Sequence, residues 1–541
     1  MARNVVLLVV LTCLAVAGCS VQVDGRPRAA GEETAAGGSA APAGEPEKLP
    51  RPKDRDLQAV TVALRKLDAC GVFDLGAARA AGNPAAAVLP SGPHSCYLVP
   101  KANYSPGDDP VELTVGDGQI DLYRYMGAPV RLAGVDAYEY RESRACQLHV
   151  PVSFTRSLRF RLAASDACPV VRQVAEASVA RLRNPDAITV DPGTRPFAAW
   201  DGCVFLAQLL GEDAGRYTFE PDGIRDPFSG CQTAEKRDEQ SAPKDKPKDK
   251  KAGEVSRSPD LEVSYDQVPG APKQSRQVGG KTVDVGDFGT GCVLTWNQGP
   301  SGVGSQWFAA QIFRLGAPDC DSAARLAEQA MLLAGQQPAD AAAAPQRPLL
   351  YNPDEPQSPS VGACVDFSVP RSELDCEPYH ETSVPRGADQ IMAAASANRN
   401  VQCAVFGDAV KAQLGPTFQA MTWGAHCFFV ESGHTLQIQV NVDADNAPGD
   451  YGDRPDLWVD RRETTVEGLP AISFWDKSRS VFDLYLSPHG DLSRKGNLHI
   501  QVEARGGRGN GDGPPQTKLD PAKAEAATKV MTDVVRRHFK G

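Results

Sequence analysis

The 541-residue sequence lacks the short motifs that would assign chemistry to it. It has no C-x-x-C pair, and its eight histidines do not cluster with cysteines at the spacing of zinc ligands. The G-x-S-x-G elbow, the H-E-x-x-H helix and the Walker loop are also absent. The sequence therefore gives no reason to assign a catalytic residue, a metal ligand or a cofactor.

Long apolar runs and an excess of basic charge are missing as well. Beyond the N-terminus no eighteen consecutive residues are apolar, so we expect no membrane-spanning helix there. Lysine and arginine number 57 against 68 aspartate and glutamate, which gives a formal net charge of -11. Nucleic-acid binding proteins carry a basic surface, so we expect no nucleic-acid partner.

The N-terminus has the parts of an export signal. Arg3 precedes a short apolar core, and residues 1–18 end in the small residues Val16-Ala17-Gly18 before Cys19. This exit resembles the lipobox of bacterial lipoproteins, which implies that Cys19 is lipidated and anchors the chain to the outer face of the cell membrane. The alternative is an ordinary secretory signal followed by a chance cysteine. Residues 19–54 contain almost no large apolar side chains, so we expect a disordered tether.

Cysteine number indicates an oxidising compartment. Of fourteen cysteines, Cys13 lies in the signal and Cys19 is the lipidation site, which leaves twelve. An exported chain with an even set of cysteines is most simply explained by disulfides.

The remaining chain repeats one order of features three times. A cysteine before a short helix is followed by a second cysteine, alternating strands and a closing helix with apolar residues three and four apart. We therefore predict an α+β fold of three tandem domains, each an antiparallel sheet covered by helices from its two ends. The predicted domains are residues 55–185, 186–336 with a charged insertion at 236–260, and 388–541, with a linker that holds a small disulfide loop at 337–387.

The repeated order also predicts the disulfides. In the first two copies a strand cysteine is followed by one at the start of the closing helix; in the third copy we place Val481 and Leu519-Asp520-Pro521 at these positions. Joint loss is expected of a bonded pair, because a single unpaired thiol is a liability in an oxidising compartment. The repeat predicts the pairs Cys70–Cys96, Cys146–Cys168, Cys203–Cys231, Cys292–Cys320 and Cys403–Cys427. Cys364 and Cys376 are left over in the segment before the third domain, and we expect them to close a small loop of their own.

A few polar and aromatic residues are weaker candidates for a site. His94 and His426 precede the second cysteine of their copies, but the middle copy has no histidine there, so we expect turn or surface positions. The acidic segment with Asp443, Asp445, Asp450 and Asp453 could supply oxygen ligands to calcium, yet its spacing is not that of an EF-hand and we expect a solvated loop. The third-copy tryptophans could line a pocket, although core packing is the commoner role; they are Trp423, Trp458 and Trp475.

The lipobox and the two cysteines that flank each first helix resemble those of uncharacterised lipoproteins of actinobacterial cell envelopes. More loosely, the units are similar to the disulfide-bearing extracellular sensor domains of mycobacterial serine/threonine kinases. The resemblance implies an envelope location and small sheet-and-helix domains, and it supplies no catalytic residues. We expect a non-catalytic binding, sensing or scaffolding protein whose partner is an envelope protein or a hydrophobic ligand, because repetition of a module favours multivalent contact. The alternative is an extracytoplasmic hydrolase with a site between domains.

Overall fold

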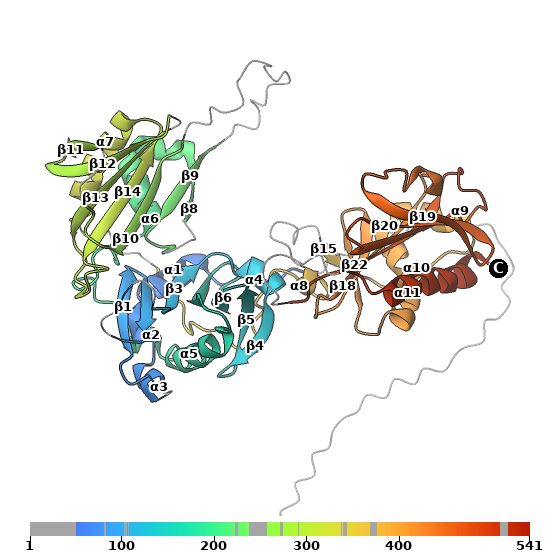
Figure 1. The fold of residues 1–541 in the computed structure, drawn as a ribbon, viewed down its shortest axis with the longest axis horizontal. Coiled ribbons are helices and arrows are strands. Elements are labelled where there is room, and N and C mark those ends of the chain that lie inside the picture. Colours follow the sequence, from blue (N-terminus) through green and yellow to red (C-terminus); the bar gives the residue numbers. More distant parts are fainter. Residues whose placement is uncertain are drawn as a thin grey trace, which may run out of the picture. The chain divides into compact units, whose positions relative to one another are not determined.

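The computed structural model describes residues 50–80, 83–101, 105, 108–221, 226–236, 257–270, 274–289, 291–336, 338, 343–367, 376–508 and 518–540 (Figure 1). The predicted signal peptide, the lipidation site Cys19, most of the tether and most of the charged insertion lie outside these residues.

Among its described residues, the first copy contains five helices and seven strands. Its helices are α1 (Leu57–Arg65), α2 (Ala69–Val72), α3 (Leu75–Ala80), α4 (Ile120–Met126) and α5 (Cys168–Arg181), and a 3₁₀ turn, η1 (Pro185–Ala187), follows them. Its strands are β1 (Ala87–Gly92), β2 (Ser95–Val99), β3 (Val111–Asp117), β4 (Ala128–Leu132), β5 (Val135–Glu142), β6 (Ala145–Pro151) and β7 (Ser157–Leu162).

The second copy repeats this order with fewer helices. It has α6 (Gly202–Leu210), η2 (Gly211–Arg216) and α7 (Cys320–Leu333). Its strands are β8 (Tyr217–Pro221), β9 (Cys231–Glu235), β10 (Asp260–Asp266), β11 (Ser275–Val278), β12 (Lys281–Asp287), β13 (Cys292–Pro300) and β14 (Ala310–Ala317).

The third copy has one strand more than the others. Its helical elements are α8 (Cys364–Phe367), α9 (Ala388–Ala397), α10 (Arg399–Gln413), η5 (Pro448–Asp450), α11 (Pro521–Val534) and the π-helical end η6 (Val535–Phe539). Its strands are β15 (Cys376–Pro378), β16 (Gln419–Trp423), β17 (His426–Val430), β18 (Leu436–Asp443), β19 (Trp458–Val466), β20 (Leu469–Asp476), β21 (Val481–Leu486) and β22 (Asn497–Ala504).

All three sheets share one antiparallel topology, so the predicted α+β class is confirmed. The first sheet runs β1-β2-β3-β7-β6-β5-β4 and the second, taken from its other edge, runs β8-β9-β10-β14-β13-β12-β11. The third runs β16-β17-β18-β22-β21-β20-β19, with β15 added beside β16. Identical strand order in three sheets is the structural counterpart of the sequence repeat.

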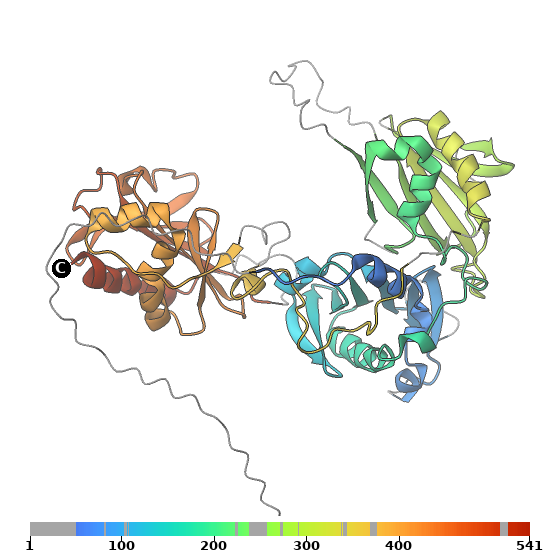
Figure 2. The same cartoon turned by 180° about the vertical axis from the view of Figure 1, so that it is seen from behind.

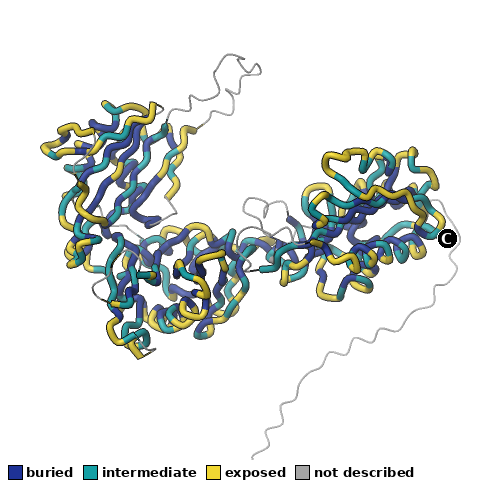
Figure 3. Tube along the Cα trace, in the orientation of Figure 1, coloured by how far each residue is buried: buried dark blue, intermediate teal, exposed yellow. Residues whose placement is uncertain are grey.

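Each sheet buries one face under the two helices that the repeat predicts. The opening helix packs on one half of the sheet and the closing helix on the other, as with α10 and α11 in the third copy (Figures 1 and 2). Strand residues that point to these helices form the apolar cores, because side chains alternate between the faces of a strand. In Figure 3 the central strands of each sheet are among the most buried segments. An aspartate caps α2 and α6 one residue before each begins: Asp68 accepts from the Cys70 N–H, and Asp201 from the Cys203 N–H.

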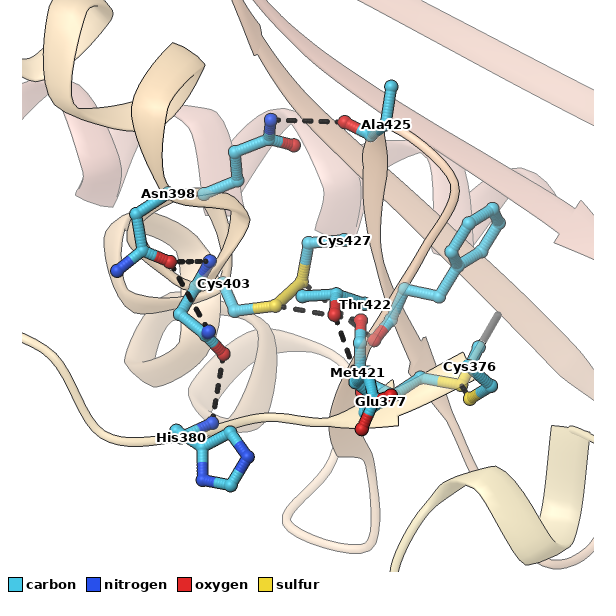
Figure 4. The surroundings of a disulfide bond; sticks show 12 residues. Cys376, Glu377, His380, Asn398, Cys403, Met421, Thr422, Ala425 and Cys427 are labelled. Atoms are coloured by element: carbon cyan, nitrogen blue, oxygen red, sulfur yellow. Dashed lines mark hydrogen bonds between the residues drawn. A yellow bond between two sulfur atoms is a disulfide. The ribbon is translucent and has the colours of Figure 1, made fainter. Parts of the chain in front are cut away.

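The structure joins the twelve described cysteines in the six predicted pairs, with Cα atoms 4.9–5.8 Å apart. In each copy the first bond ties the opening helix to the second strand of the common order. Figure 4 shows this bond in the third copy, where Cys403 on α10 meets Cys427 on β17. Cys376 lies beside Met421 in the same view, since β15 pairs with β16.

The position of Val481 differs from the prediction by one residue. Cys146 faces the helices, and its cross-strand neighbour is Leu162. In the third copy it is Phe482, paired with Val502, that faces the helices, whereas Val481 pairs with Glu503 on the opposite face. A shift of one residue exchanges the faces of a strand, and the sequence alone did not fix that shift. The start of the closing helix is held instead by a hydrogen bond from the Leu519 N–H to the Arg479 carbonyl, 2.8 Å, with Leu519 buried.

The predicted linker 337–387 is more than a linker. Leu349 and Leu350 belong to the apolar core of the first copy. Arg55 holds this segment by donating to both of their carbonyls, at 2.6 and 3.0 Å, and to the Glu355 carboxylate at 2.7 Å. Farther along, β15 is an edge strand of the third sheet. An apolar pair in a proline-rich stretch can be buried in the core of a neighbouring domain, and the composition of the stretch does not reveal this.

Candidate functional site

The strongest candidate site lies where the first two copies meet. The turn between β1 and β2 and the segment before β9 occupy the same place in the repeat, since both lead to the second cysteine of their copy. In the structure the first turn reaches into the second copy, and the second segment reaches into the first. All residues of 92–96 and 226–231 are buried.

His94 is the centre of this junction. It is fully buried, so the expectation of a surface position is wrong, although His94 does lie in the turn between β1 and β2. Its backbone N–H donates to the Asp226 carboxylate at 2.6 Å, and its Nδ1 lies 3.2 Å from the other oxygen of that carboxylate. The Ser229 hydroxyl is 3.3 Å from the same Nδ1, and Nε2 is 3.0 Å from the Ala198 carbonyl. The acidic partner of His94, which could not be identified from the sequence, is thus Asp226 of the second copy.

A serine, a histidine and an aspartate are thus together, but not in the order of a catalytic triad. In a triad the carboxylate holds one imidazole nitrogen and the nucleophile contacts the other. Here Asp226 and Ser229 share Nδ1, while Nε2 is occupied by the carbonyl oxygen of Ala198. The Ala198 carbonyl oxygen lies against Nε2, so this nitrogen is not available to take a proton from a nucleophile. The cluster serves as a buried hydrogen-bonded connection between the copies.

Phe228 makes the apolar half of the junction. Although it belongs to the second copy by sequence, its ring is buried in the core of the first. The ring lies against Gly116 on β3, where φ is +87° and any Cβ would overlap it. Its carbonyl accepts from the Gly202 N–H at 2.7 Å, at the start of α6. Glycine at 116 therefore serves both the left-handed backbone and the close approach of the ring.

An open cleft of about 1050 Å³ lies beside this junction, lined by strand residues of both sheets such as Glu112, Arg161, Glu262 and Arg314. Its floor includes Tyr97 and Phe308, whose rings meet edge to face with centroids 5.5 Å apart. Trp307, in the loop between β13 and β14, lines the cleft and is half-buried. The polar residues that line it are Ser91, Ser95, Glu112, Glu142, Gln147, Arg159, Arg161, Asp226, Gln232, Glu262, Ser264, Asp266, Gln267 and Arg314. Most of the residues that line the cleft are therefore polar.

The two walls carry matching charge pairs. In the first sheet Glu112 is directly opposite Arg161, and in the second Glu262 is directly opposite Arg314. Arg314 lies 3.4 Å from the Glu262 carboxylate, and Arg161 lies 3.7 Å from Glu142. The cleft arginines are thus paired within their own walls.

Buried polar side chains hold the guanidinium group of Arg159 in place. Its guanidinium donates to the Thr114 hydroxyl at 3.0 Å and lies 3.2 Å from the Asp117 carboxylate. Burial raises the pKa of Asp117, and Arg159 opposes that rise. Burial and Arg159 together hold the pKa of His149 well below its usual range, so this imidazole is neutral while stacked on Tyr123 at 3.7 Å. Arg159 is thus held by Thr114 and Asp117, and it lines the cleft.

The third-copy acidic residues have local roles. Asp443 accepts from the backbone N–H groups of Asp445 and Asn446, and Asp450 accepts from the Ala447 N–H at 3.2 Å. Asp453 lies 3.4 Å from Arg461. These contacts are those of a folded turn.

The remaining predicted candidates are not brought together. Trp423 packs on Phe367 and Phe428, Trp458 on Phe474, and Trp475 on Phe482, in three different clusters. His426 begins β17 and is half-buried, and burial lowers its pKa. These side chains pack on their own sheet instead of sharing a pocket.

Among the described residues, the one group of potential metal ligands is Glu139 with Cys146 and Cys168. Both sulfurs are bonded to each other, and the Glu139 carboxylate is held by Arg172 of α5. A thiolate is what binds metal, so this group fits a disulfide and not a metal centre.

Comparison with protein-family models, curated proteins and solved structures finds no match. The site must therefore be argued from its own geometry. Six disulfides are typical of an extracytoplasmic protein. Within the described part of the chain, no helix has both the length and the apolar character to cross a membrane.

The cleft residues were missed at the sequence level because they lie on polar strand faces that ordinarily meet solvent. One signal was available: Phe228 is a large apolar residue in the segment that precedes Cys231, at the repeat position near His94.

Proposed function

We propose that this protein is a membrane-anchored extracytoplasmic binding protein that holds a polar ligand in the cleft between its first two sheets. The cleft carries the proposal: it is large, open and lined by polar groups from both copies. Binding sites are commonly concave, lie between domains and hold convergent polar groups.

The junction supports the proposal because it builds the cleft before any ligand arrives. Buried contacts through His94 and Phe228 join the copies at one end of the cleft. A site that is already formed does not lose affinity to the ordering of its walls. The anchoring rests on the lipobox and the envelope location on the resemblance to actinobacterial lipoproteins and on the disulfides.

A hydrolase is the second candidate, since titratable groups from two copies line the cleft. Glycoside hydrolysis needs one carboxyl group to donate a proton and a second to attack or activate water. In this cleft Glu142 and Glu262 lie beside arginines, and both oxygens of Asp226 face His94. These carboxylates are already engaged, which favours binding over catalysis.

Photo-crosslinking tests the site without assuming the ligand. A photoreactive benzoylphenylalanine replaces Trp307 in the cleft, and Trp458 in the third copy as the matched control, in the full chain expressed in native host cells. After irradiation we expect a covalent adduct at position 307, detected by mass spectrometry, and none at 458. Equal labelling at both positions, or none at 307, would contradict the proposal.

Anchoring is tested separately by Cys19→Ser. We expect this variant to leave the membrane fraction and appear in the soluble fraction, because several acyl chains on one residue hold a protein far more firmly than the marginal single chain. Cys13→Ser, inside the signal core, is the control and should remain with the membrane. A Cys19→Ser protein that still sediments with membranes would exclude lipid anchoring at this residue.

A further inference from the structure

We propose that the ligand of the cleft is a neutral oligosaccharide. This inference rests on the proposed function and adds the chemical class of the ligand. It follows from the pairing of the charges in the walls, from the half-buried Trp307 ring at the cleft and from the likeness of the two walls.

Pairing of the wall charges disfavours a charged ligand. Arg161 and Arg314 lie close to Glu142 and Glu262, and Arg159 is held by Asp117. An anionic ligand at these arginines would also lie beside the carboxylates that pair with them, and repulsion from this like charge offsets its attraction to the guanidinium groups. A cationic ligand would be opposed in the same way by the arginines beside Glu142 and Glu262.

The hydroxyl groups of a ligand can bond to the hydrogen-bond donors and acceptors that the ion pairs do not occupy. A carboxylate has about four lone-pair sites and a guanidinium has five N–H groups, so one pairing contact exhausts neither. A sugar hydroxyl both donates and accepts, and it can bridge the two members of an ion pair without separating them. Gln147, Gln232 and Ser264 add neutral groups of the same kind to the walls.

Trp307 supplies the apolar surface that a sugar ring needs. Its side chain is half-buried at the cleft, and no aromatic ring packs on it among the described residues. Large rigid aromatic side chains offer an apolar face together with a polar edge, which matches the C–H face and the hydroxyl edge of a pyranose.

Likeness of the walls favours a chain of repeated units. Glu112 opposite Arg161 and Glu262 opposite Arg314 present the same donor and acceptor twice, once from each sheet. A volume of about 1050 Å³ has room for more than one ring. An oligosaccharide presents the same hydroxyl pattern at each unit, as the two walls require.

Calorimetric titration of the folded, disulfide-bonded mature chain tests this class. The probes are the tetrasaccharides of N-acetylglucosamine and of glucose, a tetragalacturonate as the anionic probe, and a neutral tetrapeptide. We expect at least one neutral tetrasaccharide to bind, to be recovered at full length, and to keep its affinity between about 50 and 500 mM salt, since screening acts on charges. Trp307→Ala should weaken binding by about tenfold or more through lost apolar contact. Trp458→Ala, the matched control in the third copy, should leave the affinity unchanged.

The outcomes separate this inference from the proposed function. If neither neutral tetrasaccharide binds, or the tetragalacturonate binds more tightly, the assignment of a neutral sugar is overturned. Peptide or galacturonate binding that Trp307→Ala abolishes would overturn the sugar class and leave the cleft as the binding site. Binding of any probe that Trp307→Ala does not change would overturn both.

Discussion

Phe228→Ala is expected to lower the free energy of unfolding of the first two copies by about 3–5 kcal/mol, the usual cost of emptying a buried aromatic site. Phe228 is 1% exposed, and its ring completes the core of a copy to which it does not belong by sequence. Its loss should therefore weaken the connection between copies as well as the core itself. Thermal unfolding followed by calorimetry measures the change.

Phe288→Ala is the matched control, because Phe288 lies in the same copy and is 62% exposed. It should change stability by less than about 0.5 kcal/mol, as surface substitutions do. Gly116→Ala tests the same contact from the other side, since its Cβ would occupy the place of the ring. If Phe228→Ala and Phe288→Ala unfold alike, Phe228 does not join the copies.

Removal of the second disulfide of the first copy should have the next largest effect. Cys146→Ser/Cys168→Ser opens a loop of 22 residues, which is worth about 3 kcal/mol in the chain-entropy account. For a domain of this size the melting temperature should fall by on the order of 10 °C. The double variant is compared with the parent by calorimetry under non-reducing conditions.

The third copy supplies the internal comparison for this disulfide. Its closing helix is held by packing around Phe482 and by the Leu519 hydrogen bond, without a second disulfide. Its unfolding transition should be unchanged in the Cys146→Ser/Cys168→Ser variant. A fall in the third-copy transition, or a loss below about 1 kcal/mol in the first copy, would show that the bond does not stabilise its own domain in the way loop closure requires.

Much of the fold could be predicted because the sequence contains its own comparison. The order of cysteines in the three copies predicted five of the pairs, and Cys364–Cys376 was predicted as the pair left over. The same repeat predicted the helix-sheet-helix order of each unit. Alternation of apolar residues gave the antiparallel class, since a sheet with one covered face requires it. These features are local, or they become local once the repeat is recognised.

What could not be predicted depends on contacts between distant segments. The position of Val481 failed by one residue because either face of β21 carries apolar side chains. His94 was expected at a surface turn because its acid, Asp226, is supplied by another copy. Leu349 and Leu350 lie in a proline-rich stretch whose composition gives no sign that a core will bury them.

The cleft was hidden for a related reason. Its residues, such as Arg161 and Glu262, lie on strand faces that a single domain would leave in water. These faces become the walls of a cleft only because the first two sheets lie next to each other. The contacts of Phe228 and His94 at the junction hold the sheets in this arrangement.

The proposed binding site requires the first two copies to form one unit with a fixed cleft, and a distance measurement between them tests this most directly. Spin labels on non-natural amino acids at Arg144 in the first copy and Asp284 in the second, both exposed, report the separation by pulsed electron resonance. We predict a single narrow distance distribution in the parent chain, retained in Phe288→Ala and broadened in Phe228→Ala. A broad distribution in the parent chain would contradict the account, because the junction would then not hold the walls of the cleft in place.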